Sequence, residues 1–378
     1  MNMDMGSGWR FMHDGSVFAE FNHQGGERGG DEFVAPNWWM GMATRDTSRG
    51  RLTFTGMFSL DPATVGMEGY REILQSGEAL NGRPIIDHQH PHDLLMQLAA
   101  IWRVPMPASV GLTFAAAPVG EPALGPIAFM HRASAADNPT APLGHHLFDS
   151  THVSFGVVAA ALDRGPWVLE GSVFNGREPD QDRWDFDFGR LDSFSGRLWF
   201  RPRPTWAFQI SRGHLTSPEA LEPGNIDRTT ASGSWTRTTS DGVTSIGGGL
   251  GRNDSDHGAR NGLFLEAARQ SRRGGLYTRF EALQVETSLL LTGLATDGDA
   301  FSIKDPVRTA TLGGTGRIFG ARRIEGSLGL DLTFYSVPAS LKTAYGHHPV
   351  SFHLFFRLRP VAGSMGRMWN MQMSRPMG

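Results

Sequence analysis

What this chain lacks narrows its class. It has 378 residues and no cysteine, so it folds without disulfides, as suits an exported protein. No run of about 18 apolar residues occurs, which excludes a transmembrane helix. The formal net charge is only -3, which argues against nucleic acid as a partner. A hydrophobic content of 39% does not exclude a membrane barrel, because the strands of such a barrel are apolar on one face alone.

Alternating hydrophobicity is the main signal that is present. From Val350 to Arg359, apolar side chains occupy the even positions and mostly polar or charged side chains occupy the odd ones. Successive side chains of a strand point to opposite faces, so this segment has one apolar and one wet face. The segments 51–60 and 324–334 alternate in the same way. Each pattern predicts a half-buried strand.

Sixteen segments are predicted as strands. They are 10–22, 35–45, 51–60, 93–103, 108–117, 152–162, 166–176, 190–201, 204–214, 227–238, 242–253, 260–272, 274–286, 307–318, 324–335 and 349–359. Seven connections between them are short and carry Gly, Pro or Asp, and the other eight are predicted to be long, in strict alternation. Short turns at one rim and long loops at the other are typical of an outer-membrane barrel.

We therefore predict an all-β fold, a single antiparallel transmembrane β-barrel of about 16 strands within a range of roughly 14–18. It would have short periplasmic turns and long outer loops. The barrel would cover residues 9–360, between Met-rich tails at 1–8 and 361–378. An even number of strands puts both tails at the short-turn rim. The third long loop, about residues 118–150, is long enough to fold inward and narrow the pore.

Two further sets of side chains fit such a barrel. Tryptophans beside short turns suggest an interfacial girdle, although a tryptophan can also pack in a soluble β core. They are Trp102, Trp167, Trp199 and Trp206. Charged residues fall on the wet faces, where burial would cost several kcal/mol each unless they were paired. They are Glu170, Arg197, Arg201, Arg279, Glu281, Glu325, Asp331, Arg357 and Arg359. A water-filled lumen would remove this cost.

Histidines concentrate in the predicted long loops and are candidate metal ligands. The candidates, with one carboxylate, are His88, His90, His92, His131, His145, His146, Asp149 and His152. Neutral imidazole with carboxylate is the common ligand set for Zn(II), Cu(II) and Ni(II). In an extended backbone His88, His90 and His92 would share one face. The alternative is that these are ordinary turn and hydrogen-bonding residues of polar loops.

Methionines gather at both ends of the chain. The C-terminal candidates for metal binding are Met368, Met371 and Met373. Thioethers are soft ligands that favour Cu(I) over hard cations. We predict soft-metal capture by this tail, and the alternative is a disordered tail with no ligand.

Catalytic motifs are sparse. Asp149, Ser150 and His152 are close in sequence, but sequence adjacency is not triad geometry. The glycines of 247–251 lie inside a strand pattern and open no helix, so they form no phosphate loop. We predict no catalytic residues and no cofactor other than copper or zinc.

Several segments resemble one family of uncharacterised bacterial proteins. They are 87–96, the motifs within 120–152 that end in Asp149-Ser150-Thr151-His152, Phe174-Asn175-Gly176-Arg177-Glu178-Pro179, and 217–223. That family looks like outer-membrane β-barrels and is loosely associated with copper-resistance settings. More broadly, the chain resembles porin-type barrels. The resemblance covers most of residues 9–360 and implies a barrel in the outer membrane.

The function predicted from the sequence is passive passage or handling of a small solute or metal ion, copper first, across a bacterial outer membrane. The expected partners are outer-membrane lipid, the solute or ion, and a second copy of the chain in a homo-oligomer. The first six residues do not form a signal peptide, so export requires a signal already removed or another route. Two alternatives remain. One is a lipid-modifying hydrolase on a barrel, using His152 with Ser150 or a bound metal, and the other is a soluble all-β binding protein.

Overall fold

The computed structural model describes residues 3–4, 8–294, 301–321, 323–362, 367–368 and 372–373. The strands are β1 (Met3–Asp4), β2 (Trp9–Gln24), β3 (Gly30–Val34), β4 (Asn37–Thr47), β5 (Gly50–Phe58), β6 (Tyr70–Leu80), β7 (Arg83–Gln89), β8 (Leu95–Met106), β9 (Val110–Gly120), β10 (Ser154–Arg164), β11 (Trp167–Phe174), β12 (Ser193–Arg203), β13 (Trp206–Leu215), β14 (Ile226–Thr239), β15 (Gly242–Ser255), β16 (Gly258–Ser271), β17 (Gly274–Glu286), β18 (Lys304–Gly320), β19 (Ile324–Ser336) and β20 (Val350–Pro360).

The helices are short. The α-helices are α1 (Asp61–Thr64), α2 (His145–Phe148), α3 (Thr287–Thr292) and α4 (Lys342–Tyr345). The 3-10 helices are η1 (Pro107–Ser109), η2 (Phe129–His131), η3 (Ser150–His152) and η5 (Ala339–Leu341). No helix among the described residues is long and apolar enough to cross a membrane.

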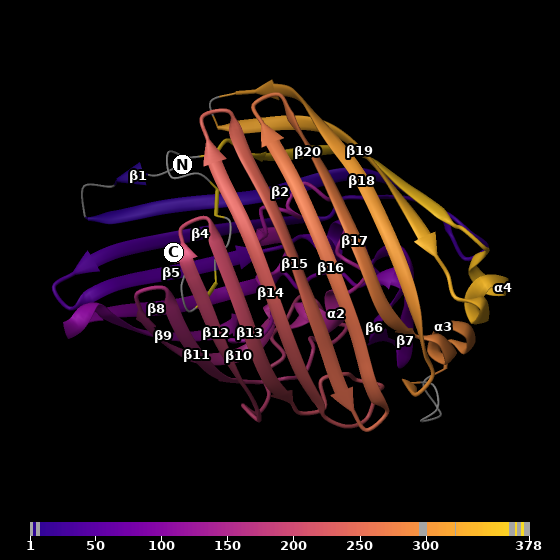
Figure 1. The fold of residues 1–378 in the computed structure, drawn as a ribbon, viewed down its shortest axis with the longest axis horizontal. Coiled ribbons are helices and arrows are strands. Elements are labelled where there is room, and N and C mark those ends of the chain that lie inside the picture. Colours follow the sequence, from indigo (N-terminus) through magenta and orange to yellow (C-terminus); the bar gives the residue numbers. More distant parts are fainter. Residues whose placement is uncertain are drawn as a thin grey trace.

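The strands form a closed antiparallel barrel (Figure 1). Apart from β3 and the hairpin β6–β7, each strand pairs with the next strand of the wall along the chain, β5 pairs with β8, and β20 pairs back onto β2 through Phe21 opposite Leu354. Since β3 and β4 pair with β2 one after the other, they fill one position in the wall, and the barrel has 16 strands. The prediction of about 16 strands is confirmed. β1 is an extra strand on β2, and β6 with β7 forms a separate hairpin that the sequence did not predict.

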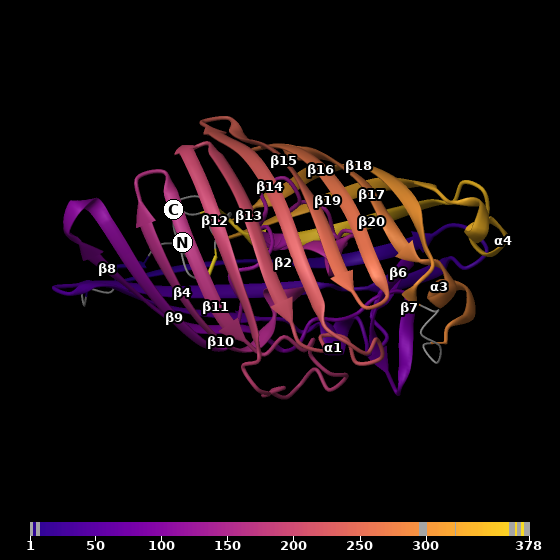
Figure 2. The ribbon, with the colours of Figure 1, turned by 60° about the horizontal axis from the view of Figure 1, so that its bottom comes forward.

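The two rims of the barrel differ. Connections such as Gly165-Pro166 and Ser240-Asp241 are tight turns at one rim (Figures 1 and 2), and the first residue of β2 and the last residue of β20 lie at that rim too. The hairpin β6–β7 and the helices α3 and α4 lie at the other rim. One predicted long connection, 254–259, is wrong, because Asp256-His257 forms a two-residue turn between β15 and β16. Loop lengths therefore do not alternate strictly.

The two faces of the wall are as alternation predicts. Leu330 and Leu354 are paired across β19 and β20, and each is about half exposed on the outer face. Their neighbours Asp331 and His353 are also paired and are buried inside. An apolar exterior around a polar interior is the arrangement that a barrel in lipid requires.

The tryptophan prediction holds only in part. Trp102, Trp167 and Trp206 are exposed on the outer face near short turns. The prediction for Trp199 is wrong, because this side chain is buried on the inner face and its Nε1–H donates to Glu170 at 2.9 Å. Trp199 lies two residues from both Arg197 and Arg201 in β12, so the period of two places it on the same inner face as those arginines.

Residues 121–153, between β9 and β10, fold into the barrel and are called the lumen loop below. All are buried except Glu121, Ala136 and His152, which are partly exposed. Arg197 of β12 donates to the carbonyl of Gly125 at 3.0 Å, and Glu281 of β17 accepts the N–H of Gly144 at 2.8 Å. The predicted inward fold of this loop is confirmed. Ion pairs and contacts with this loop, rather than a wide aqueous channel, offset the burial of the inner charges.

Candidate functional site

Five histidines form an unbroken row of ring contacts inside the barrel. In order, they are His146, His90, His145, His152 and His92. The ring centroids of successive members lie 5.1, 6.1, 5.2 and 5.5 Å apart. His90 and His92 follow β7, and the other three belong to the lumen loop. The row therefore exists only because the loop folds back against the segment after β7.

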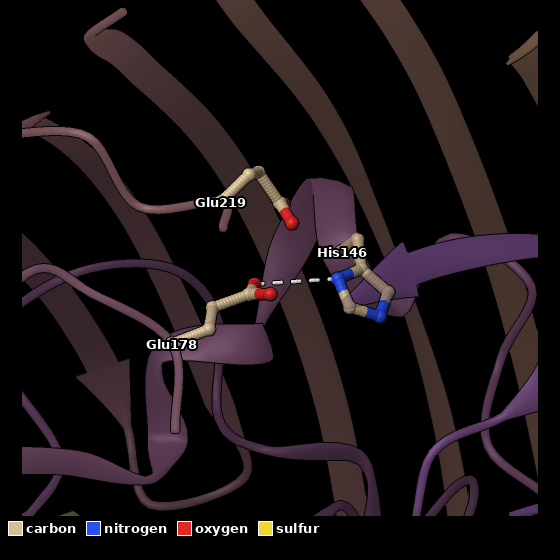
Figure 3. Close-up of side chains that lie close together, drawn as sticks. All are labelled: His146, Glu178 and Glu219. Carbon is tan, nitrogen blue, oxygen red and sulfur yellow. Dashed lines mark hydrogen bonds and ion pairs between the residues drawn. The ribbon is translucent and has the colours of Figure 1, made fainter. Parts of the chain in front are cut away.

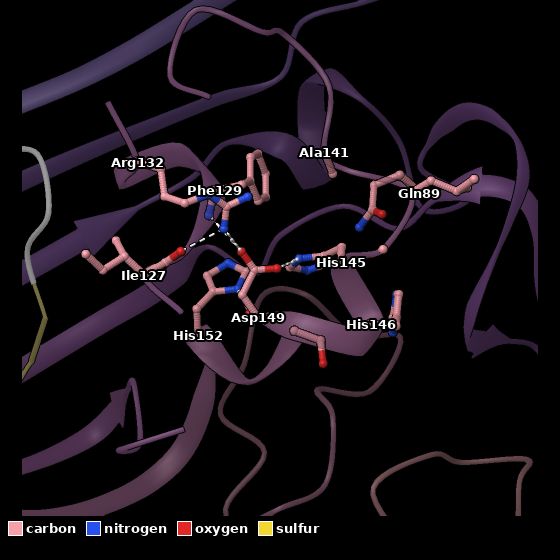
Figure 4. A network of polar contacts seen from close by, with 12 residues as sticks. Gln89, Ile127, Phe129, Arg132, Ala141, His145, His146, Asp149 and His152 are labelled. Atoms are coloured by element: carbon pink, nitrogen blue, oxygen red, sulfur yellow. Dashed lines mark hydrogen bonds and ion pairs between the residues drawn. The ribbon is translucent and has the colours of Figure 1, made fainter. Parts of the chain in front are cut away.

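Most rings of the histidine row are held through Nδ1. His145 Nδ1 lies 2.9 Å from Asp149 Oδ1, and His152 Nδ1 lies 2.8 Å from the backbone oxygen of Asp149 (Figure 4). His92 Nδ1 lies 2.8 Å from Asp61 Oδ2. An acceptor at Nδ1 places the proton there and leaves Nε2 free to accept or to bind a metal.

The opposite nitrogens supply the coordinating capacity of this row. The buried Nε2 atoms of His90, His145, His146 and His152 have no hydrogen-bond partner among the described residues. Burial lowers the pKa of each of these four imidazoles, and it lowers that of His146 to about 4. The four rings are therefore neutral at pH 7, which is the protonation state that binds metal ions.

Asp149 holds the centre of the row. Its carboxylate accepts from Arg132 Nη1 at 2.8 Å and from the backbone N–H of Phe129 at 2.9 Å, besides its contact with His145 (Figure 4). Burial alone would raise the pKa of this carboxyl, but the Arg132 guanidinium and His145 hold it well below its usual range. A permanent charge here fixes the orientation of His145, so Asp149 is a positioning group.

Carboxylates surround the His146 end of the row. His146 Nδ1 lies 3.3 Å from Glu178, and ligand atoms of His146, Glu178 and Glu219 all lie within 4.8 Å of one another (Figure 3). Glu78, which lies 3.1 Å from His90 Nδ1, lines a cavity of ≈620 Å³ together with Glu178, Glu219 and Glu222. This cavity is called the vestibule below. Its concentration of carboxylates favours cations.

Other predicted ligands lie elsewhere. His88 is outside the row, with its Nδ1 3.0 Å from the carbonyl of Ile86. His131 is buried against Trp38, at 5.0 Å between ring centroids. Met368 and Met373 are buried inside the barrel rather than exposed at its rim, and Met371 lies outside the described residues.

Sequence reasoning missed two groups. Glu178 and Glu219 were not candidates, although each lies in a segment singled out for its family resemblance. Inward methionines of the wall, such as Met40 and Met42, were also missed. Reading which face of the strand each methionine occupies would have found them, because the period of two applies to Met40 and Met42 as well.

The two residues proposed for a hydrolase have separate partners. The Ser150 hydroxyl accepts from Arg228 Nη1 at 3.1 Å, whereas His152 Nδ1 faces the backbone of Asp149. Their arrangement is not that of a nucleophile with its base.

Comparisons with known proteins agree on the fold. No protein-family model and no curated protein matches this chain. Among solved structures, an anion-selective porin from Comamonas acidovorans has a TM-score of 0.55 at 9% identity, covering 93% of this chain and 99% of the porin. OmpF of Salmonella typhi has a TM-score of 0.55 at 6% identity, covering 95% and 100%. OprB of Pseudomonas putida has a TM-score of 0.53 at 9% identity, covering 94% of both chains. The chain thus has the fold of outer-membrane porins.

Proposed function

We propose that this protein is an outer-membrane barrel of the porin type that binds a metal ion in its lumen and passes it along. Copper and zinc are the favoured ions. The observation that carries the proposal is the histidine row, with four buried Nε2 atoms that have no hydrogen-bond partner among the described residues.

The outer surface supports the membrane part of this proposal. Large apolar side chains such as Leu276, Leu250 and Leu169 are more than half exposed on the outer face, while the inner face carries the ion pairs. A soluble all-β binding protein would not gain from such an exterior, because that much exposed apolar surface promotes aggregation in water. One similar structure, OmpT of Vibrio cholerae, is described as a trimer form, and a homo-oligomer is part of this proposal.

The order of the sites supports passage. The vestibule lies at the end of the row that His146 and His90 form, and Glu178 and Glu78 contact those two rings. A cation attracted by the vestibule would meet His146 and His90 first, then His145 and His152. Beyond the vestibule, the lumen loop occupies the inside of the barrel, so the ion would travel along the histidines of this loop rather than through open water.

The ring spacing fits pairwise binding. The centroid of an imidazole lies about 3 Å from an ion bound at Nε2, so two such rings on one tetrahedral ion have centroids about 5 Å apart. The successive spacings in the row are 5.1–6.1 Å. Among the described residues, no three ring nitrogens of the row lie within 4.8 Å of one another. Conduction requires sites that an ion can also leave, and pairwise sites are weaker than a closed tetrahedral cage.

Metal binding by matched variants tests this proposal. The full chain is folded in detergent, and Zn(II) and Cu(II) binding are measured by calorimetry for the wild type, His90→Ala and His88→Ala. His90 contacts both His145 and His146, whereas His88 lies two residues away and outside the row. We expect His90→Ala to weaken binding by about tenfold or more and His88→Ala to leave it unchanged.

Liposomes loaded with a zinc-sensitive dye then test passage. Zinc influx should fall in His90→Ala and persist in His88→Ala. If both variants bind and conduct zinc like the wild type, the row has no part in metal handling, and the barrel is better explained as a general diffusion pore. Lipid hydrolysis that depends on His152 would favour the enzyme instead.

A further inference from the structure

A cluster of methionines lines one part of the lumen. Seven buried methionines pack together there. They are Met12 of β2, Met40 and Met42 of β4, Met57 of β5, Met96 of β8, Met130 of the lumen loop and Met368 of the C-terminal tail. They are called the methionine cluster below. The wall contributes five of them from four neighbouring strands.

The register of the wall brings these thioethers together in pairs. Met12 lies opposite Met42 across β2 and β4, and Met40 lies opposite Met57 across β4 and β5. Directly opposed residues on one face of a sheet have Cβ atoms about 4.5–5.5 Å apart. A methionine side chain extends well beyond that distance and is flexible, so opposed pairs can place two sulfurs on one ion.

A small cavity of ≈20 Å³ joins the methionine cluster to the histidine row. Met40, Met57, Met96 and Met373 line it, together with His131 and His152. Its volume corresponds to about one water-sized sphere. His131 Nδ1 and His152 Nε2 are buried without a hydrogen-bond partner among the described residues. Sulfur and nitrogen donors therefore surround a space that suits a single ion.

Ordinary packing does not account for this composition. Elsewhere the inner wall carries paired charges, such as Glu170 with Arg197 at 2.6 Å. The same cluster contains Val119, Phe129, Val153 and Phe155, and the partly buried Leu95 packs against it. Its buried members among the described residues nevertheless include no leucine or isoleucine, which specify a core more sharply than methionine. The feature that distinguishes methionine from leucine of similar volume is its soft, polarisable sulfur.

We propose that the methionine cluster is a binding site for a soft monovalent cation, Cu(I) or Ag(I). Several thioethers select such ions, whereas imidazole also accepts Zn(II) and Cu(II). This inference deepens the proposed function and rests on it for the route, since the ion would arrive from the histidine row through His152. No oxidation or reduction takes place in this step, because the ion enters and binds in the monovalent state.

The C-terminal tail completes the site. The backbone N–H of Met368 donates to Asp14 Oδ2 at 3.0 Å, and Arg367 Nη1 donates to Asp14 Oδ1 at 3.1 Å. Gln372 accepts from Arg201 Nη2 at 3.2 Å and lines the same cavity as Met373. These contacts hold Met368 and Met373 against the wall methionines. The tail thus supplies ligands from the side of the short turns.

Silver binding to the full chain in detergent tests the inference. The variants are the triple change Met40→Leu, Met42→Leu and Met57→Leu, and a control with Met67→Leu and Met106→Leu, both of which are exposed. Leucine keeps the volume of methionine and removes the sulfur. We expect the triple variant to lose at least about tenfold in Ag(I) affinity while keeping its Zn(II) affinity, and the control to match the wild type in both.

X-ray absorption of Ag(I) bound to the wild-type protein keeps the test decisive if the triple variant does not fold. Sulfur neighbours around silver would support the site, and nitrogen or oxygen neighbours alone would overturn it. Unchanged Ag(I) affinity in a folded triple variant would overturn it as well. Loss of Zn(II) binding in His90→Ala is a separate result, so the proposed function and the methionine site can fail independently.

Discussion

Arg132 of the lumen loop and Glu266 of β16 form a two-point ion pair inside the barrel, with Nη2 to Oε1 at 2.9 Å and Nε to Oε2 at 3.0 Å. Both side chains are buried, and Arg132 also pairs with Asp149, the carboxylate that contacts His145 of the histidine row. One guanidinium thus connects the wall, the loop and the candidate site.

Removing this guanidinium should free the lumen loop. Arg132→Ala leaves Glu266 and Asp149 buried with one partner fewer. Breaking a buried pair in this way lowers the stability of the packed state by about 3–5 kcal/mol. We expect larger single-channel conductance in planar bilayers. Arg10→Ala, which breaks an exposed pair with Asp46 at 2.8 Å, is the control and should behave like the wild type. Equal conductance in all three proteins would mean that Arg132 does not hold the loop in place.

Acid should favour displacement of the lumen loop in the metal-free protein. Burial lowers the pKa of His131 from 6.5 to about 4, and Asp14 offsets only part of this effect. A displaced loop exposes the ring to water, so below pH 6.5 the displaced state binds a proton that the packed state does not. This linkage favours displacement by about 2 kcal/mol at pH 5 and is absent above pH 7.

Conductance measured between pH 7 and pH 5 checks this prediction. It should rise on acidification in the wild type and rise less in His131→Phe, which keeps a ring against Trp38 but cannot take up a proton. An identical pH response in the two proteins would rule out His131 as a contributor.

Metal binding near the vestibule should release a proton. Burial raises the pKa of Glu219 to about 8, and the neighbouring Glu178 adds to this shift. Glu219 is therefore mostly protonated at pH 7 without metal, and affinity should increase as the pH rises from 7 through 8. Calorimetry in two buffers of different ionisation enthalpy should detect the released proton in the wild type. Glu219→Gln should not release it, whereas His88→Ala should.

The outer face should tolerate arginine according to depth. Leu354 is about half exposed near the middle of β20, and Leu354→Arg should lower the free energy of unfolding by about 2–4 kcal/mol. Val350 lies at the end of the same strand, and Val350→Arg should lower it by about 0–1 kcal/mol. Unfolding in urea from lipid vesicles measures both. The inward neighbour Ser351 does not serve as a control, because it is fully buried and its hydroxyl donates to Gln24 Oε1 at 3.0 Å. Costs that do not depend on depth would contradict a membrane at this level.

The sequence by itself determined the wall. A period of two is a local property, so the face of Leu354 or Asp331 follows from its position along the strand, and the strand number follows from counting such segments. Turn residues located most of the short connections for the same reason. The exception at Asp256-His257 arose because a strand can extend into polar sequence when its partner continues alongside.

Only the tertiary structure decided the interior. His90 and His145 are 55 positions apart, and no local pattern indicates that their rings meet. The same holds for Arg132 with Glu266, and for Met40 with Met373 around one cavity. These contacts depend on how the lumen loop and the tail fold into a closed barrel. Burial then compels most polar groups to find partners, and the four Nε2 atoms that have none among the described residues are the exceptions that call for a ligand.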